Sequence, residues 1–132
     1  MKHPDWQNRL NAVMKAAIER PFSWGKHDCC LFAADCTQAM CGDDYAADWR
    51  GTYDSETGAK KAILTGGGTL EKVIGKYLDE VPVKLAQRGD IAIVENGGAK
   101  CAGVVYSGSV WVPGENGLVS LRVKPLSVWR VR

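Results

Sequence analysis

Residues 22–30 read Phe22-Ser23-Trp24-Gly25-Lys26-His27-Asp28-Cys29-Cys30 and place a Trp-Gly turn directly before a helix start. Asp28 is a good N-cap, and Gly42 is a suitable end for the helix that follows. The apolar side of this helix is formed by Leu31, Phe32, Ala39 and Met40. Small residues elsewhere along it let other elements approach its backbone closely. The segment therefore predicts a buried central helix that begins at Cys29.

The position of Cys29 is chemically special. Unpaired backbone amides and the positive end of the helix dipole favour a thiolate at a helix start, which lowers the pKa of the thiol and makes it a better nucleophile. A cysteine at a helix end can equally be a small apolar residue that only fills space. Position alone leaves both readings of Cys29 open.

Three more helices are expected around this one. The first runs from about Asp5 to Glu19 and ends before Pro21. Its core-facing stripe consists of Trp6, Leu10, Val13, Met14 and Ala17. The third starts near Asp54 or Ser55 and ends at Gly66–Gly68, and the fourth follows from Thr69 to about Leu78. Residues 43–53 lack any regular period and are expected to form an ordered loop that packs its aromatic side chains.

From residue 81 onward the pattern changes to strands. Five are expected, at residues 91–95, 101–106, 110–112, 118–123 and 128–132, with glycine-rich turns between them. Trp111 and Trp129 fit either the sheet core or a contact surface. Helices followed by strands indicate an α+β fold with the N-terminal helices packed on a C-terminal antiparallel β-meander. The length of 132 residues predicts a single domain, 1–132.

The string Phe22-x-Trp24-Gly25-x-x-Asp28-Cys29, followed by Arg88-Gly89-Asp90-Ile91 before the strands, resembles the NlpC-type, papain-like cysteine peptidases of the cell wall. It is most similar to the short, divergent relatives encoded beside tail-hub genes in tailed phages and gene transfer agents. The resemblance covers about Trp6 to Val112. It implies a papain-like fold, with Cys29 at the nucleophile position and Asp28 as the aspartate that precedes it.

The general base of that family is not found in this sequence. A histidine begins the second strand of these peptidases in a His-apolar-Gly-apolar pattern, whereas the matching string here is Cys101-Ala102-Gly103-Val104. His27 is a weak alternative base, because a residue so close to Cys29 in the chain is expected to cap the helix or face solvent. A peptidase of this type needs an imidazole near the sulfur, so its activity is expected to be weak or lost.

Composition excludes several other classes of function. The net charge of +2 is scattered, which argues against nucleic acid as a partner, and the longest apolar runs are too short to span a membrane. The five cysteines match no zinc or iron–sulfur spacing, so we expect free thiols with no metal and no cofactor. The first residues lack the apolar segment of a signal peptide, which predicts synthesis in the host cytoplasm.

The preferred hypothesis is a bacteriophage tail-tip subunit in the virion tail, with the hub and the tape-measure region as partners. The alternative is an active murein peptidase or amidase, carried by the particle, that cuts peptidoglycan with Cys29 as nucleophile. A third hypothesis is a thiol-handling enzyme of the host cytoplasm.

Overall fold

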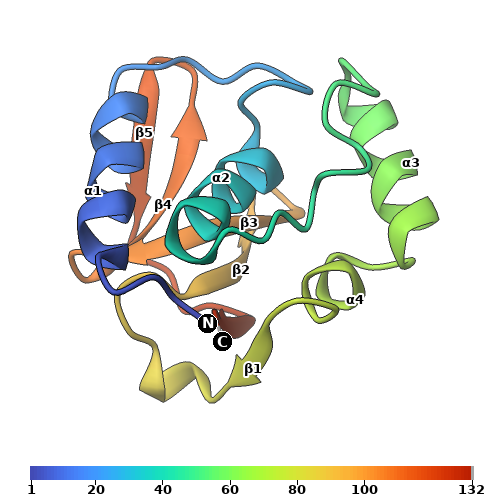
Figure 1. The fold of residues 1–132 in the computed structure, drawn as a ribbon. Coiled ribbons are helices and arrows are strands. Elements are labelled where there is room, and N and C mark those ends of the chain that lie inside the picture. The colour runs from blue at the N-terminus through green and yellow to red at the C-terminus, as the bar shows by residue number, and fades with distance from the viewer. Residues whose placement is uncertain (132) are drawn as a thin grey trace.

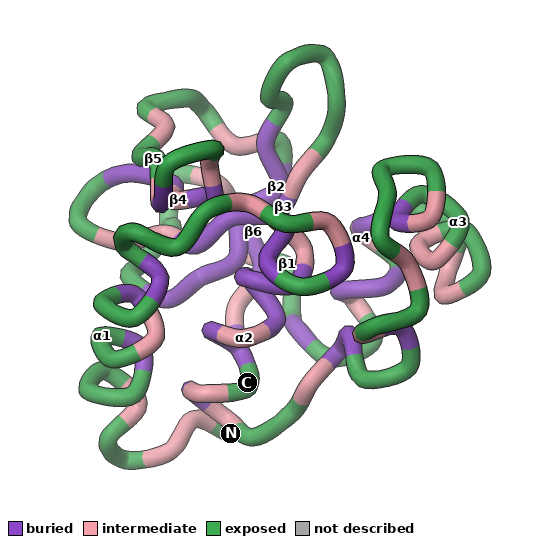
Figure 2. Tube along the Cα trace, turned by 90° about the horizontal axis from the view of Figure 1, so that it is seen from above, coloured by how far each residue is buried: buried purple, intermediate pink, exposed green. Residues whose placement is uncertain are grey.

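The computed structural model describes residues 1–131. Helix α2 (Cys29–Cys41) lies at its centre (Figure 1). One carboxylate oxygen of Asp28 accepts the Leu31 amide at 3.0 Å, and Gly42 ends the helix in the left-handed conformation at φ 86°. Seven of its residues are buried, so the tube in Figure 2 is largely purple along this helix. The predicted central helix and both of its ends are confirmed.

Helix α1 (Trp6–Ala17) packs against α2. Leu10, Met14 and Ala17 are buried in the core, and Trp6 and Val13 pack against it as half-buried neighbours. The apolar stripe read from the sequence therefore has the core role that was expected.

Helices α3 (Glu56–Gly66) and α4 (Leu70–Ile74) lie to one side of the domain (Figure 1). Ser55 and Thr69 cap them by accepting the amides of Gly58 and Lys72. Helix α4 is shorter than expected, because Gly75 disfavours the helical conformation. The residues after it form separate hydrogen-bonded turns that end at the buried Leu78. Residues 43–53 form the expected ordered loop, with Tyr45 and Trp49 buried.

Six strands form one antiparallel sheet in the order β1-β6-β2-β3-β4-β5. They are β1 (Asp79–Val81), β2 (Ile91–Asn96), β3 (Ala99–Tyr106), β4 (Ser109–Gly114), β5 (Gly117–Leu121) and β6 (Ser127–Arg130). A short 3-10 helix, η1 (Val83–Leu85), follows β1. β2 to β5 are the predicted meander. The expectation of a meander to the end of the chain is wrong, because β6 returns to pair with β2 and β1.

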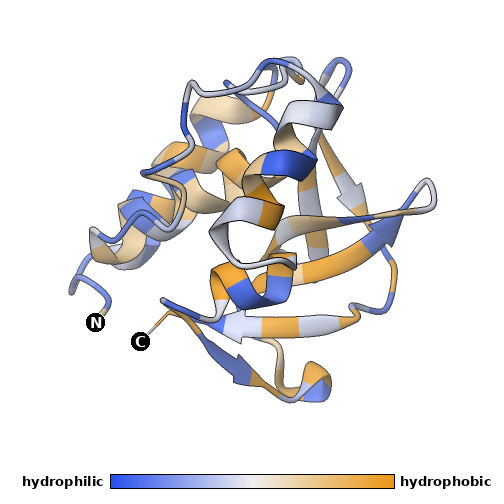
Figure 3. Cartoon of the chain, turned by 90° about the vertical axis from the view of Figure 1, so that its right-hand side faces the viewer, coloured by the Kyte–Doolittle hydropathy of each residue, from blue (hydrophilic) through white to orange (hydrophobic). Residues whose placement is uncertain are grey.

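The centre of the sheet is buried on both faces. Ile91 and Ile93 pack with the helices, while Ala92 and Val94 belong to a second apolar cluster on the opposite face with Val110, Val112 and Val128. Figure 3 shows many orange, hydrophobic segments in the sheet and in the helices packed against it. Trp129 is buried in the core, and half-buried Trp111 donates its indole N–H to the Tyr106 carbonyl at 2.7 Å. The architecture is therefore α+β, with helices covering one face of an antiparallel sheet.

The Gly89-Asp90 turn fixes the start of β2. Gly89 has φ 89°, and a Cβ there would lie 2.9 Å from the Trp6 ring. Asp90 is fully buried and accepts two hydrogen bonds from the Arg130 guanidinium, at 3.0 and 2.9 Å. This ion pair ties the entry of β2 to β6.

Among residues 1–131, none of the helices combines the length and apolar character needed to cross a membrane.

Candidate functional site

Cys29 and Cys101 line one cleft of about 220 Å³. The cleft is enclosed by the Trp-Gly turn, by the end of the 43–53 loop, by α3 and by the turn between β2 and β3. Phe22 and Trp24 meet edge to face at one wall, with ring centroids 4.7 Å apart. Three regions of the sequence, residues 22–30, 49–63 and 96–101, therefore meet around the thiol that the sequence singled out.

The sheet register brings Cys101 to Cys29. Cys101 lies opposite Val94 on β2 and faces the second apolar cluster, against which Cys29 also packs. Both cysteines are half-buried, and their thiol groups are hydrogen-bonded to each other. The strand position at which the resemblance to NlpC-type peptidases leads us to expect a histidine thus presents a thiol to the helix start.

The two thiols ionise as a pair. Their hydrogen bond, together with burial, raises the pKa of Cys29 well above its ordinary value, and the same bond lowers the pKa of Cys101. The first proton is therefore lost from Cys101, and a second thiolate beside the first is opposed by repulsion. The effect of the helix start, which by itself favours a thiolate at Cys29, is outweighed by this neighbour.

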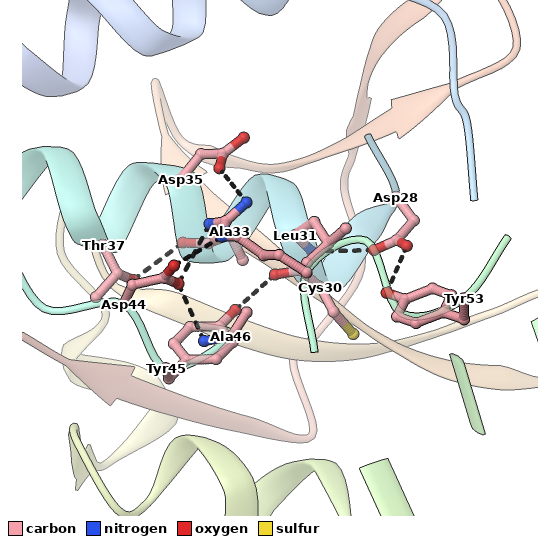
Figure 4. A network of polar contacts seen from close by, with 11 residues as sticks. Asp28, Cys30, Leu31, Ala33, Asp35, Thr37, Asp44, Tyr45, Ala46 and Tyr53 are labelled. Atoms are coloured by element: carbon pink, nitrogen blue, oxygen red, sulfur yellow. Dashed lines mark hydrogen bonds and ion pairs between the residues drawn. The ribbon is translucent and has the colours of Figure 1, made fainter. Parts of the chain in front are cut away.

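Asp28 organises the helix start. It is only 2% exposed, and its two oxygens accept the Leu31 amide and the Gly25 amide at 3.0 Å each. The Tyr53 hydroxyl adds a third hydrogen bond at 2.7 Å, visible at the right of Figure 4. Burial and this contact with the carboxylate raise the pKa of Tyr53, so the phenol stays protonated as the donor. Asp28 acts as an N-cap, as expected, and also joins the turn to the 43–53 loop.

The Trp-Gly turn requires its glycine. Gly25 has φ 80°, and a Cβ at this residue would lie 1.9 Å from the Tyr53 carbonyl oxygen. Ser23 and His27 close the turn with a backbone bridge, in which the His27 amide donates to the Ser23 carbonyl at 2.7 Å. The turn is therefore pressed against the loop that supplies Tyr53.

His27 lies on the other side of the helix start. The residue is 1% exposed and lines a separate hollow between α1 and α2, and its ring packs edge to face on Phe32. Neither ring nitrogen has a hydrogen-bond partner among the described residues, so His27 does not contact the Cys29 sulfur as a base. Burial lowers the pKa of His27, and nearby Arg20 adds to this effect. The expectation of a capping or solvent-facing His27 is wrong, because the bridge to Ser23 turns the ring into the core.

His3 lies at the opposite end of α2, with its ring beside Gly42. The distance along the helix from Cys29 to Gly42 is about 20 Å at 1.5 Å per residue. Neither histidine of the chain is therefore placed to assist Cys29.

A second polar network joins α2 to the 43–53 loop. The Tyr45 hydroxyl donates to the Cys30 carbonyl at 2.8 Å, and Arg50 bridges Asp44 and Asp35 at 2.7 and 2.8 Å (Figure 4). Burial raises the pKa of Cys30 to about 12, although the Ala102 amide donates to its sulfur. Cys30 is therefore an inert thiol that packs α2 onto β3.

Sequence reasoning missed the roles of Tyr45, Arg50 and Tyr53. The aromatic content of residues 43–53 gave the only signal, and it indicated packing rather than hydrogen bonding to α2.

The neighbours of Cys101 on β4 are apolar. By the pairing of Val105 with Val110, the β4 residues that share its face are Val110, Val112 and Gly114. None has a polar side chain that could orient an imidazole, which a nucleophile–base pair requires. Among the described residues, no group of three or more His, Cys, Asp or Glu side chains is arranged to hold a metal ion.

Residues 1–131 match the model of a family described as a domain of unknown function, DUF6950. The chain belongs to this family. The search of curated proteins finds no match for it.

Proposed function

We propose that this member of the DUF6950 family is a papain-like domain of the NlpC type whose peptidase activity is lost, and that it serves as a structural subunit of a phage tail tip. The observation that carries the proposal is the pairing of Cys29, at the start of α2, with Cys101 on β3. A peptidase of the related family would have a histidine at the place of Cys101.

The arrangement of elements supports the NlpC-type part of the proposal. A central helix with a cysteine at its amino end packs on an antiparallel sheet, and Gly89-Asp90 precedes β2 as in the related peptidases. Gly103, in the Cys101-Ala102-Gly103-Val104 string, is fixed by close packing, since a Cβ there would lie 2.6 Å from a methyl group of Val110. The strand thus keeps its glycine while the base beside it is replaced.

The chemistry of the pair supports the loss of activity. A cysteine peptidase needs a base that holds the thiolate and later protonates the leaving amine. Cys101 raises the pKa of Cys29 instead of lowering it, and His27 is turned away. Removing such a base reduces the rate by a factor of about 10² to 10⁴.

The tail-tip role rests on the resemblance to relatives encoded beside tail-hub genes. A subunit of this kind needs a defined shape rather than a reactive centre. The polar networks of Asp28 and Arg50 supply such rigidity around a helix start that no longer needs them for catalysis. In this proposal the domain resides in the virion tail, contacts the hub and the tape-measure region, and makes no more than passive contact with peptidoglycan.

The test of activity uses purified peptidoglycan and four proteins. The wild type and Cys29→Ala should release equal background amounts of peptide, measured by mass spectrometry. Cys101→His should give only weak release, because no polar side chain on the facing part of β4 orients the new imidazole. Cys101→His combined with Cys29→Ala should return to background, because the imidazole acts only through the Cys29 sulfur. Release by the wild type that disappears in Cys29→Ala would replace this proposal with the alternative, an active murein peptidase carried by the particle.

The structural role is tested in the particle itself. Mass spectrometry of purified tails should find the protein together with the hub, and its gene should lie beside the genes for the hub and the tape measure. A gene placed in a metabolic operon, with no protein in purified tails, would contradict the tail-tip role.

A further inference from the structure

Only one pair among the five cysteines of the chain is placed for covalent contact. Cys36 is fully buried, and Cys41 lies at the far end of α2 with its thiol donating to the Thr37 carbonyl at 3.2 Å. The Cys30 sulfur is engaged by the Ala102 amide. Cys29 and Cys101 remain, half-buried and in direct contact at the edge of an open cleft.

We propose that Cys29 and Cys101 form a reversible disulfide that closes the cleft and locks the start of α2 onto β3. The inference goes beyond the proposed function, because it needs only the two facing thiols and holds whatever the domain binds. It also gives the cysteine at the histidine position a role of its own.

Access and freedom of movement favour this bond. Both cysteines line the cleft of about 220 Å³ and neither is fully buried, so an oxidant can approach them from solvent. β3 pairs with β4 only from Val104 onward, which leaves residues 99–103 bonded to β2 alone. That stretch can adjust to the geometry of a disulfide without breaking a second row of hydrogen bonds.

The order of the chemical steps follows from the ionisation of the pair. With oxidised glutathione as the oxidant, the Cys101 thiolate attacks one sulfur of the glutathione disulfide, which forms a mixed disulfide and releases one glutathione thiolate. Cys29 then gives its proton to solvent and attacks the Cys101 sulfur, which forms the Cys29–Cys101 bond and expels the second glutathione. The protein dithiol loses two electrons, and one glutathione disulfide is reduced to two thiols.

The bond should change stability as well as shape. It would close a loop of about 70 residues, and cross-links of that span restrict the unfolded chain strongly. Oxidation should therefore raise the Tm by on the order of 10 °C, and dithiothreitol should reverse the rise.

The experiment titrates the protein with glutathione redox buffers and then counts free thiols by maleimide labelling after denaturation. The wild type should lose two of its five thiols, and peptide mapping should show a Cys29–Cys101 link. Cys29→Ser and Cys101→Ser should each prevent the link and the Tm rise. Cys41→Ser is the matched control, since it removes a half-buried thiol elsewhere on α2 and should leave both intact.

Two results would overturn the inference. One is a wild type that keeps five free thiols in the most oxidising buffer. The other is a link mapped to a different pair, or glutathione held stably on a single cysteine. Both readouts use the wild-type protein and do not depend on whether a serine variant folds. They are also independent of peptidoglycan release, so this inference and the proposed function can fail separately.

Discussion

The two sides of the amino end of α2 differ in whether their reactive side chains have hydrogen-bond partners. On the cleft side, the Cys29 and Cys101 thiols are hydrogen-bonded to each other. On the other side, the His27 imidazole is buried between α1 and α2 with neither nitrogen bonded among the described residues. A working nucleophile and base would lie on the same side, within hydrogen-bonding distance.

Between these two sides lies a carboxylate that is fully satisfied. Asp28 accepts three hydrogen bonds and joins the turn, the helix and the 43–53 loop. Asp28 thus holds the shape of the helix start, while neither nitrogen of His27 reaches Cys29 as a hydrogen-bond partner. Packing and hydrogen bonding are therefore sufficient to hold a cysteine at a helix start without a base beside it.

The largest expected effect on stability comes from the Trp-Gly turn, which leads into the start of α2. Gly25→Ala places a Cβ 1.9 Å from the Tyr53 carbonyl oxygen at a φ of 80°. We expect a loss of about 3 kcal/mol or more in the free energy of unfolding, because the turn or the loop must move and the left-handed conformation adds its own cost. Urea denaturation measures this difference.

Gly51→Ala is the matched control for that experiment. Gly51 also has a positive φ, 73°, but a Cβ there would meet nothing within 4 Å. Its cost should be about 1 kcal/mol, from backbone conformation alone. Equal losses in the two variants would show that the contact between the turn and Tyr53 is unimportant.

The next effect concerns the carboxylate itself. Asp28→Ala leaves two amides and a tyrosine hydroxyl without their acceptor, so we expect a loss of about 2–4 kcal/mol. Tyr53→Phe removes one of the three donors and should cost about 1–2 kcal/mol. Thermal or urea unfolding of the two variants compares them directly. If Asp28→Ala cost no more than Tyr53→Phe, the N-cap and turn contacts of Asp28 would contribute nothing.

The sequence predicted the helices well because their ends carry local signals. Asp28, Ser55 and Thr69 are N-caps whose side chains bond amides only three residues ahead, so their meaning is contained in a short window. β1 was missed because it has only three residues, and its exposed or half-exposed side chains give no alternation. The return of β6 to β2 was missed because strand order depends on contacts between distant residues.

The residues of the candidate site also differ in whether a local sequence pattern could predict them. Cys29 and Cys101 could be found from short motifs, and the structure brings them together. The orientation of His27 could not be read from spacing, because it is set by the backbone bridge to Ser23 and by the packing of its ring on Phe32. The hydroxyl of Tyr53 reaches Asp28 across 25 positions, which no local pattern encodes.

The smallest expected effect is a pH dependence of the free energy of unfolding that arises from His27. Burial lowers the pKa of His27 in the folded protein, whereas the unfolded chain has the ordinary value of about 6.5. Between these two pKa values the unfolded state binds more protons than the folded state. The free energy of unfolding therefore has its highest value above pH 6.5 and falls as the pH decreases toward the folded pKa. The slope should reach at most about 1.4 kcal/mol per pH unit.

His27→Leu should flatten this slope, and at neutral pH it should be neutral or stabilising because it removes two unbonded nitrogens from the core. His3→Gln is the control, since it removes the other histidine and should keep the slope of the wild type. The measurement is the free energy of unfolding in urea at several pH values between 5 and 8. If His27→Leu and the wild type lost stability in parallel below pH 6.5, carboxylates would be responsible, and His27 would be solvated rather than confined against Phe32. In that case the contrast between the two sides of α2 would lose its physical basis.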